Sequence, residues 1–409
     1  MGRPVHRADP PGDDPSVTKT IGECRVCGAA EADPFFRLAG VPVQDGLLFP
    51  SRREALAAPT GDLELVFCPA CGYIGNRAFD PSKLRYDPTY DISLHHSPAY
   101  RQFIGELAER LAREHHLAGK SVLEIGCGKG DFLRALCERA GCRGIGFDPT
   151  SIAPDGGAGT DRVRIVRELY SERFAHEPAD LVCCRHLLDA IGDVRGFLRT
   201  LRRTLGTRTE STVYFEVPDG SVVFRRKVVW NAIYEHCSYF TPPSLDRLFT
   251  ESGFDVRSIT ACFQDEYLGL EASPSLDFRS GAGPGEMVAR LAGDVETFAE
   301  LYRETTARWA DWLQDLRRAG RRAVLWGAGA RAVAFLSALQ PGEEVPYLVD
   351  INPHRQGLFL PRTGQPVLAP ESLSRDPPDI VLITNPAFAE EIRAQASGLG
   401  VRGDVLVLD

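Results

Sequence analysis

The sequence lacks any run of 18 uncharged apolar residues, since even its most hydrophobic stretch, 323–339, is interrupted by Arg331. We therefore expect no membrane-spanning segment and no membrane partner. An excess of positive charge is also missing, because 47 Lys and Arg residues face 56 Asp and Glu residues. The resulting net charge of −9 argues against a nucleic-acid partner. Residues 1–20 contain no apolar core of the signal-peptide kind, so we expect a cytoplasmic protein.

The length of 409 residues is enough for two or three domains of about 150 residues each. Hydrophobic residues make up 43% of the chain and aromatic residues 9%, which is ordinary for a globular protein. The composition therefore argues against a fibrous or largely disordered chain.

Four of the eleven cysteines form two Cys-x2-Cys pairs, Cys24 with Cys27 and Cys68 with Cys71, and each pair is followed by glycine. In a reducing cytoplasm, close pairs indicate metal ligands rather than disulfides. Glycine can take the positive φ that turns backbone amides toward thiolate sulfur. Four thiolates on two tight turns match the tetrahedral coordination of structural Zn²⁺ and leave no position for water. The sequence predicts a structural zinc site, with disulfides or free thiols as the alternatives.

A second motif combines an apolar strand with a glycine-rich turn. The strand is predicted over 121–125, and the glycines after it are Gly126, Gly128 and Gly130. Such a turn, followed by a helix, brings backbone amides and partial positive charge to a ligand. Glu124 lies at the end of the strand, and a second strand over 144–147 finishes in Asp148. A carboxylate at that tip can accept both ribose hydroxyls of a bound nucleoside.

These residues resemble the class I S-adenosylmethionine-dependent methyltransferases, whose nucleoside signature is Glu/Asp-x-Gly-x-Gly-x-Gly with an acid closing the next strand. The resemblance implies a Rossmann-like fold and S-adenosylmethionine as cofactor, with its methionine moiety over the glycines. A third strand, predicted over 180–184, ends near His186 and Asp189, where such enzymes face the donor and the acceptor. A nicotinamide dehydrogenase is the alternative, but its loop usually follows Gly-x-Gly-x-x-Gly and its pyrophosphate is poorly matched to Glu124.

A candidate base lies in the aromatic segment 230–240. Methyl transfer is an in-line displacement, so the enzyme supplies alignment and, for a protonated acceptor, a base with a pKa near neutral. His236 fits this role, and Glu235 or a neighbouring carboxylate can fix its tautomer. A packing role for His236 is the alternative. The tyrosine and histidine segment 86–100 before the next predicted helix is either boundary packing or a substrate lid.

The C-terminal part begins with a predicted long helix, whose apolar positions run from Leu291 to Leu316 at helical spacing. A second strand and glycine turn follow over 323–330, and a strand over 347–350 ends in an acid. We interpret this as a Rossmann-like scaffold that has lost its own cofactor and shapes the substrate pocket. Cofactor binding at the Gly327 turn is the alternative.

Together, the cysteine pairs, the glycine motif, the Glu-His step and the C-terminal domain resemble the three-domain bacterial sugar C-methyltransferases. Those enzymes methylate a carbon next to the ketone of a deoxysugar nucleotide in antibiotic and cell-surface sugar pathways. The resemblance implies that His236 is the base for an enolate-forming proton abstraction, and that Glu235, Tyr234 and Tyr90 orient the acceptor. The chain departs from the family at Ile233, where a tyrosine is common, and lacks a histidine in the helix after the third strand.

We therefore expect an α/β protein with a class I methyltransferase domain and two further parts. The predicted divisions are a disordered tail over 1–20, a zinc-binding module over 21–88, an S-adenosylmethionine-binding domain over 89–275 and a C-terminal helix with a Rossmann-like domain over 276–409. The expected function is C-methylation of a small molecule, a nucleotide-linked keto-deoxysugar of secondary metabolism. The alternatives are O- or N-methylation of another metabolite, nicotinamide chemistry, or a non-enzymatic zinc scaffold for a partner protein. The pattern does not indicate an oligomeric state.

Overall fold

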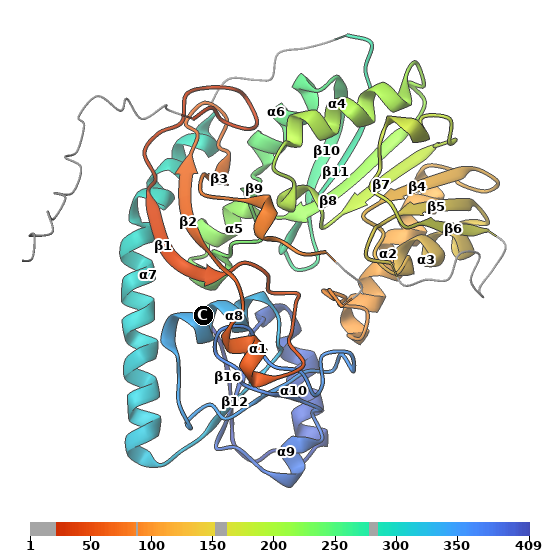
Figure 1. Ribbon diagram of the computed structural model, residues 1–409. Helices are drawn as coiled ribbons and strands as arrows, with labels where there is room; N and C mark the ends of the chain where they lie inside the picture. Colours follow the sequence, from red (N-terminus) through yellow and green to blue (C-terminus); the bar gives the residue numbers. More distant parts are fainter. Residues whose placement is uncertain (1–21, 87–88, 152–161, 278–284) are drawn as a thin grey trace, which may run out of the picture.

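The computed structural model describes residues 22–86, 89–151, 162–277 and 285–409, and these form three β-sheets (Figure 1). The disordered tail predicted over 1–20 lies outside the described residues. No helix within these ranges is long and apolar enough to cross a membrane.

A four-stranded antiparallel sheet forms the N-terminal module, in the order β1-β2-β3-β9. Its elements are β1 (Phe36–Pro42), α1 (Arg52–Leu56), β2 (Thr60–Phe67), β3 (Ile74–Asn76), η1 (Pro81–Lys83) and β9 (Ser238–Tyr239). The last strand comes from a distant part of the chain, since Ile74 pairs with Tyr239 and Gly75 with Ser238. The module is therefore tied directly to the segment that carries His236.

The central sheet has seven strands in the order β10-β11-β8-β7-β4-β5-β6. They are β4 (Ser121–Ile125), β5 (Arg143–Phe147), β6 (Val163–Val166), β7 (Leu181–Arg185), β8 (Thr212–Pro218), β10 (Phe254–Cys262) and β11 (Tyr267–Pro274). Strands β4 to β8 are parallel, whereas β11 runs antiparallel to both neighbours. The order reverses at β4, and α/β proteins bind ligands beyond the strand ends at such a point.

Helices cover both faces of this sheet. They are α2 (Pro98–Glu114), α3 (Asp131–Ala140), η2 (Glu172–Phe174), η3 (Leu188–Ala190), α4 (Val194–Leu205) and α6 (Pro242–Glu251). The short helices α5 (Gly220–Arg225) and η4 (Val229–Asn231) pack instead in the core between the N-terminal module and the C-terminal sheet. Successive residues of β4 serve opposite faces. Val122 shares a core with α2 and α3, whereas Leu123 shares one with α4 and α6. The sheet is therefore buried on both sides, as its nearly unbroken apolar strands predict.

The C-terminal sheet is entirely parallel, in the order β14-β13-β12-β15-β16. Its elements are β12 (Ala323–Trp326), α8 (Ala330–Leu339), β13 (Leu348–Val349), β14 (Val367–Leu368), α9 (Ser372–Arg375), β15 (Ile380–Ile383), η5 (Pro386–Phe388), α10 (Ala389–Gly398) and β16 (Asp404–Val407). Strand β12 lies between β13 and β15, so the Gly327 turn occupies a second point of reversal. The predicted Rossmann-like arrangement is confirmed here.

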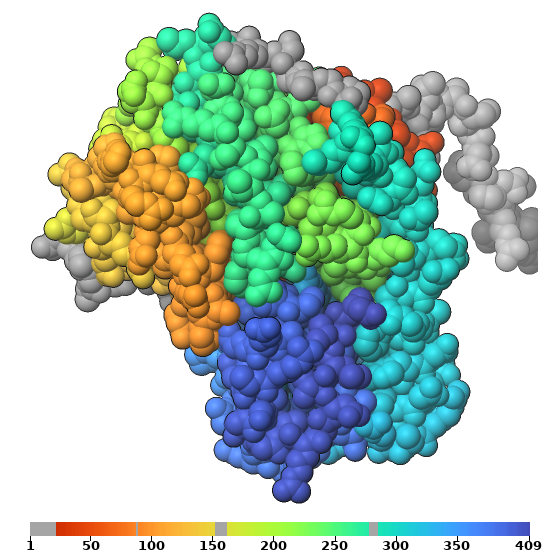
Figure 2. Space-filling model, turned by 180° about the vertical axis from the view of Figure 1, so that it is seen from behind, coloured from red at the N-terminus to blue at the C-terminus, as the bar shows by residue number. Residues whose placement is uncertain are grey.

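The predicted long helix is α7 (Glu286–Ala319), which runs along the side of the molecule from the N-terminal sheet to the C-terminal one (Figure 1). Phe298 packs against Phe36 of β1, with ring centroids 5.1 Å apart, and Trp309 packs 5.4 Å from Phe335 of α8. Seen from behind, the C-terminal part lies beneath the central part and beside α7 (Figure 2). The predicted domain boundaries stay predictions. Strand β9 lies within the predicted range 89–275 but pairs with β3 of the N-terminal sheet.

Candidate active site and metal centre

A cavity of about 660 Å³ opens between the three parts of the chain. Its wall contains the glycine turn after β4, residues 90–97, the Glu235–His236 step and the glycine turn after β12. The volume lies in the range of small-molecule sites, about 300–1,000 Å³. One continuous space therefore connects both glycine turns with the candidate base.

The glycine turn after β4 adopts the backbone that the motif predicts. Gly126, Gly128 and Gly130 all have positive φ, at 72°, 54° and 79°. Gly126 and Gly128 line the cavity, whereas Gly130 is the N-cap of α3. A Cβ at Gly126 would lie 2.8 Å from a methyl of Leu187, so the turn tolerates no side chain there.

Asp148 lies at the tip of β5 and is already held by the same turn. Its Oδ2 accepts a 2.8 Å hydrogen bond from the Gly128 amide. Its Oδ1 accepts bonds from the amide and the hydroxyl of Thr150, at 2.8 and 2.7 Å. A carboxylate has about four lone-pair positions, so these three bonds orient Asp148 and leave it acceptor capacity for a ribose hydroxyl.

Glu124 is only 3% exposed, and its Oε2 has no hydrogen-bond partner within the described ranges. Burial raises the pKa of Glu124 to about 8, although the nearby Arg185 charge acts in the opposite direction. An uncompensated buried carboxyl beside a cavity favours a cationic ligand, because a positive charge restores the ionised form.

His186 follows β7 and lies in the cavity wall, where the sequence places it. Its φ of 52° is unusual for a residue other than glycine. Its Nε2 lies 2.8 Å from Glu216 Oε1 and 3.4 Å from the Tyr100 hydroxyl. Burial acts to raise the pKa of Glu216, but Arg185 at 2.7 Å and His186 together lower it to about 2. The sequence analysis missed this network; its signal is the single acid inside the apolar strand β8.

Glu235 and Tyr90, both predicted beside the acceptor, form a direct pair. The Tyr90 hydroxyl donates a 2.6 Å bond to Glu235 Oε1, and the Asp45 amide donates to Oε2 at 3.3 Å. Glu235 is 5% exposed. Burial, followed by the charge of Asp45, raises the pKa of Glu235 well above its ordinary value.

His236 lies in the same wall with a different carboxylate beside it. Its Nε2 is 3.3 Å from Oδ2 of Asp189, which belongs to η3. The imidazole is one-quarter exposed, so it can reach a ligand in the cavity.

Tyr234 requires a correction, because its ring points away from the cavity and into the N-terminal module. Its hydroxyl accepts a 2.8 Å bond from the Asp80 amide, and its ring packs 5.6 Å from that of Phe79. A Cβ at Gly61 would come within 2.2 Å of this ring. The neighbours Ile233 and Glu235 line the cavity. Tyr234 is therefore a buried packing residue and cannot orient the acceptor.

The C-terminal side of the cavity contains residues for which sequence reasoning proposed no role. Asp350, at the tip of β13, accepts 2.8 Å bonds from the amides of Ala328 and Asn352. Arg355 lies 3.5 Å from Asp350 and donates to the carbonyl of Asp91. The Gly327 turn thus repeats the bonding pattern of the first glycine turn and faces the same space.

Arg331 joins this side to the central sheet. Its guanidinium is 7% exposed and bonds Glu266 of the β10–β11 connection, Asn231 of η4 and Asn385 after β15. Three partners from three segments hold this wall of the cavity in place.

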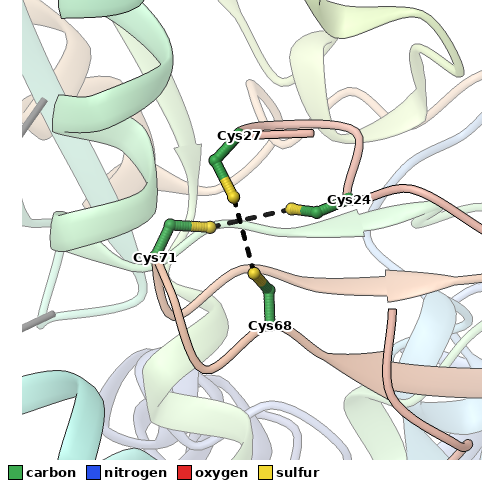
Figure 3. Close-up of side chains that lie close together, drawn as sticks. All are labelled: Cys24, Cys27, Cys68 and Cys71. Carbon is green, nitrogen blue, oxygen red and sulfur yellow. Dashed lines mark hydrogen bonds between the residues drawn. The ribbon is translucent and has the colours of Figure 1, made fainter. Parts of the chain in front are cut away.

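The four predicted metal ligands meet at one point, with their sulfur atoms directed toward one another from two turns (Figure 3). Cys24 and Cys71 have sulfur atoms 3.7 Å apart, and those of Cys27 and Cys68 are 3.6 Å apart. The glycine after each pair has positive φ, 71° and 75°, as expected. A tetrahedron with Zn–S bonds of about 2.3 Å has edges of about 3.8 Å, so the cluster has the size of a Cys₄ metal site.

Comparisons with known proteins agree with this geometry. Residues 95–259 match a methyltransferase-domain family, and residues 289–408 match the C-methyltransferase C-terminal domain. The C-methyltransferase NovU of Streptomyces niveus is 26% identical over 397 residues, which cover 92% of each chain. The chain is therefore similar to a C-methyltransferase over nearly its whole length. It is an S-adenosylmethionine-dependent methyltransferase, the activity that the sequence motifs predict in preference to nicotinamide chemistry or a non-enzymatic scaffold.

Solved structures of methyltransferases each cover less than half of this chain. An S-adenosylmethionine-dependent methyltransferase from Mesorhizobium loti is 19% identical and covers 42% of this chain and 99% of its own, with a TM-score of 0.34. A Burkholderia thailandensis 1,6-didemethyltoxoflavin N1-methyltransferase, solved with S-adenosylhomocysteine, is 16% identical and covers 44% and 81%, with a TM-score of 0.33.

The donor side of the cavity fits S-adenosylmethionine. The buried, unpartnered Glu124 oxygen suits a ligand with positive charge, and Asp148 offers an acceptor to a ribose. The space above Gly128 is open, since a Cβ there would meet nothing within 4 Å. Bound in this place, S-adenosylmethionine supplies an electrophilic methyl group.

Proposed function

We propose that the methyltransferase methylates a carbon next to the ketone of a nucleotide-linked keto-deoxysugar in secondary metabolism. The continuity of the cavity supports this most strongly. A donor site, a histidine with two nearby carboxylates and a second nucleoside-type turn border one space of about 660 Å³. A substrate with a nucleotide at one end and a reactive sugar at the other matches that arrangement.

In this proposal His236 removes the proton from the carbon beside the ketone. The adjacent carbonyl matters because it spreads the carbanion charge onto oxygen. Tyr90 and Glu235, bonded to each other at 2.6 Å, orient the acceptor, and Glu124, Gly126, Gly128 and Asp148 hold the donor. His186 braces the wall between the two sites through Glu216.

The nucleotide of the substrate lies against the C-terminal glycine turn. Asp350 is oriented by two amides, as Asp148 is, and can accept a ribose hydroxyl. The N-terminus of the ten-residue helix α8 adds amides and partial positive charge for a phosphate. Arg355 supplies a cation at the same wall.

We propose that the four cysteines hold a structural Zn²⁺ ion. Cys68→Ser removes one of four ligands, so we expect the variant to lose zinc and the N-terminal module to be destabilised. Metal analysis of purified protein and thermal denaturation measure both effects. Wild-type protein without bound metal would contradict the proposal, and Cys262→Ser, outside the cluster, is the matched control.

The test of the substrate is a screen with isotopically labelled S-adenosylmethionine. Nucleotide-linked 4-keto-6-deoxysugars are compared with other small metabolites, and mass spectrometry identifies the product that gains the label. Label on a carbon of a nucleotide sugar supports the proposal. Label on an oxygen or nitrogen of another metabolite favours the alternative, O- or N-methylation of a different small molecule. A screen in which no nucleotide sugar gains label argues against C-methylation of a nucleotide-linked sugar.

A further inference from the structure

Two carboxylates flank His236, and their surroundings differ. Glu235, its neighbour in the chain, is engaged by the Tyr90 hydroxyl and the Asp45 amide. Asp189 has Oδ2 3.3 Å from His236 Nε2, while its Oδ1 is buried without a hydrogen-bond partner in the part of the chain that the structure describes. We propose that Asp189 is the positioning residue for His236. It holds the Nε2 proton and leaves Nδ1 as the nitrogen that accepts the substrate proton.

The backbone position of Asp189 and the contacts of its turn support this assignment. It lies in the short turn η3, directly beyond the sheet strand β7, and only 7% of its side chain is exposed. The thiol of Cys237 donates to the Asp189 carbonyl at 3.3 Å, so the turn is bonded to the residue that follows His236. The two side chains therefore need little further ordering to meet.

Residues beside the cysteine cluster hold the backbone next to this pair. The carbonyl of Cys237 accepts bonds from Arg25, between the first two cysteines, and from the Tyr73 hydroxyl, at 3.5 and 3.4 Å. The Tyr73 hydroxyl also bonds Ser238 at 2.7 Å. The N-terminal module thus holds the backbone that directly follows His236.

The distance of 3.3 Å is long for a charge-assisted hydrogen bond, and such catalytic contacts tighten when ligands bind. A neutral imidazole whose Nε2 proton faces a carboxylate presents an unprotonated Nδ1. The opposite tautomer would leave Asp189 Oδ2 facing the lone pair of Nε2, which is unfavourable for a buried carboxylate.

The inference rests on the proposed function for its chemical step. Nδ1 forms a bond to the proton, and the electron pair of the C–H bond becomes the C=C of an enolate with its charge on oxygen. The enolate carbon then bonds the methyl carbon, the sulfur–carbon bond breaks, and its electron pair stays on sulfur. The imidazolium formed at His236 is stabilised by Asp189.

The test uses nuclear magnetic resonance of the full chain with ¹⁵N-labelled histidine, saturated with S-adenosylhomocysteine at about pH 8, where histidine is ordinarily neutral. The His236 resonances are assigned by their loss in His236→Gln. We expect the proton on Nε2 in the wild type. In Asp189→Asn both tautomers become populated, because an amide can accept from the ring or donate to it. Asp189→Ala provides a second, smaller replacement, and Glu235→Gln is the matched control that keeps the wild-type tautomer.

The proposal is overturned if Nδ1 carries the proton in the wild type, if the Asp189 variants leave the His236 tautomer unchanged, or if Glu235→Gln shifts it as far as Asp189→Asn does. No sugar is needed, so failure of the substrate proposal leaves this test intact. Conversely, if the wild type methylates a nucleotide sugar although the Asp189 variants leave the His236 tautomer unchanged, that result keeps the proposed function and overturns only the positioning role of Asp189.

Discussion

The two glycine turns of the molecule have the same backbone plan but different chemistry. In each, an acid at the tip of the next strand accepts a 2.8 Å bond from a turn amide, Asp148 from Gly128 and Asp350 from Ala328. Two residues before the first glycine, the first turn has the buried acid Glu124, whereas the second has Leu325 within an apolar core. The shared plan suits a nucleoside, and the acid adds a preference for positive charge.

The third glycine position differs as well. Gly130 caps α3 at a φ of 79°, whereas the matching position in the second turn is Arg331, which bonds three segments around the cavity. At this position the second turn therefore has a side chain that connects parts of the molecule. The two turns thus differ at two matching positions, Glu124 against Leu325 and Gly130 against Arg331.

The largest expected effect is the loss of the proposed base, His236. Because His236 belongs to neither glycine turn, its replacement should impair turnover without impairing donor binding. His236→Ala should lower turnover by roughly 10²- to 10⁴-fold and leave donor affinity close to that of the wild type, as expected for a lost general base. Turnover with the acceptor found by the screen and calorimetry with S-adenosylmethionine measure the two quantities. Wild-type turnover in this variant would remove His236 from the mechanism.

The next effect tests whether the first glycine turn binds the donor and the second binds the nucleotide of the substrate. Asp148→Ala should weaken S-adenosylmethionine binding on the order of 10- to 100-fold, because charged hydrogen bonds are lost. Asp350→Ala is the matched variant, and it should leave donor affinity unchanged while raising the KM of the nucleotide sugar. Calorimetry and steady-state kinetics measure the pair. Equal losses of donor affinity in both variants would contradict the division.

The smallest effect concerns the acid that distinguishes the first turn. Since the pKa of Glu124 is raised to about 8, donor affinity should rise with pH below that value, by up to about tenfold between pH 7 and pH 8. The ligand-free protein should lose stability over the same window, from about pH 4.3 to 8, because the folded state binds the extra proton. Glu124→Gln should flatten both profiles, in calorimetry and in thermal denaturation. A pH-dependent affinity that persists in this variant would point to another group.

Local pattern was sufficient for much of the fold. Strands β4 and β12 were predicted from apolar runs that end in glycine, and α7 from apolar spacing between Leu291 and Leu316, because these elements are buried on the faces that the patterns mark. The convergence of the four cysteines was predictable too. Each turn needs only its own cysteine pair and the glycine after it, and four thiolates match one tetrahedral metal site. Tyr234 was placed wrongly because adjacency to Glu235 says nothing about which side of an irregular segment a ring occupies.

The sequence by itself determined the chemistry that short segments can contain: a glycine turn with an acid two residues before it, paired thiolates, and a histidine beside a carboxylic acid. Only the tertiary structure decided which of these face one another. Asp189 reaches His236 from 47 residues away, and β9 joins a sheet formed far earlier in the chain, because strand pairing and burial bring together groups that no local spacing connects.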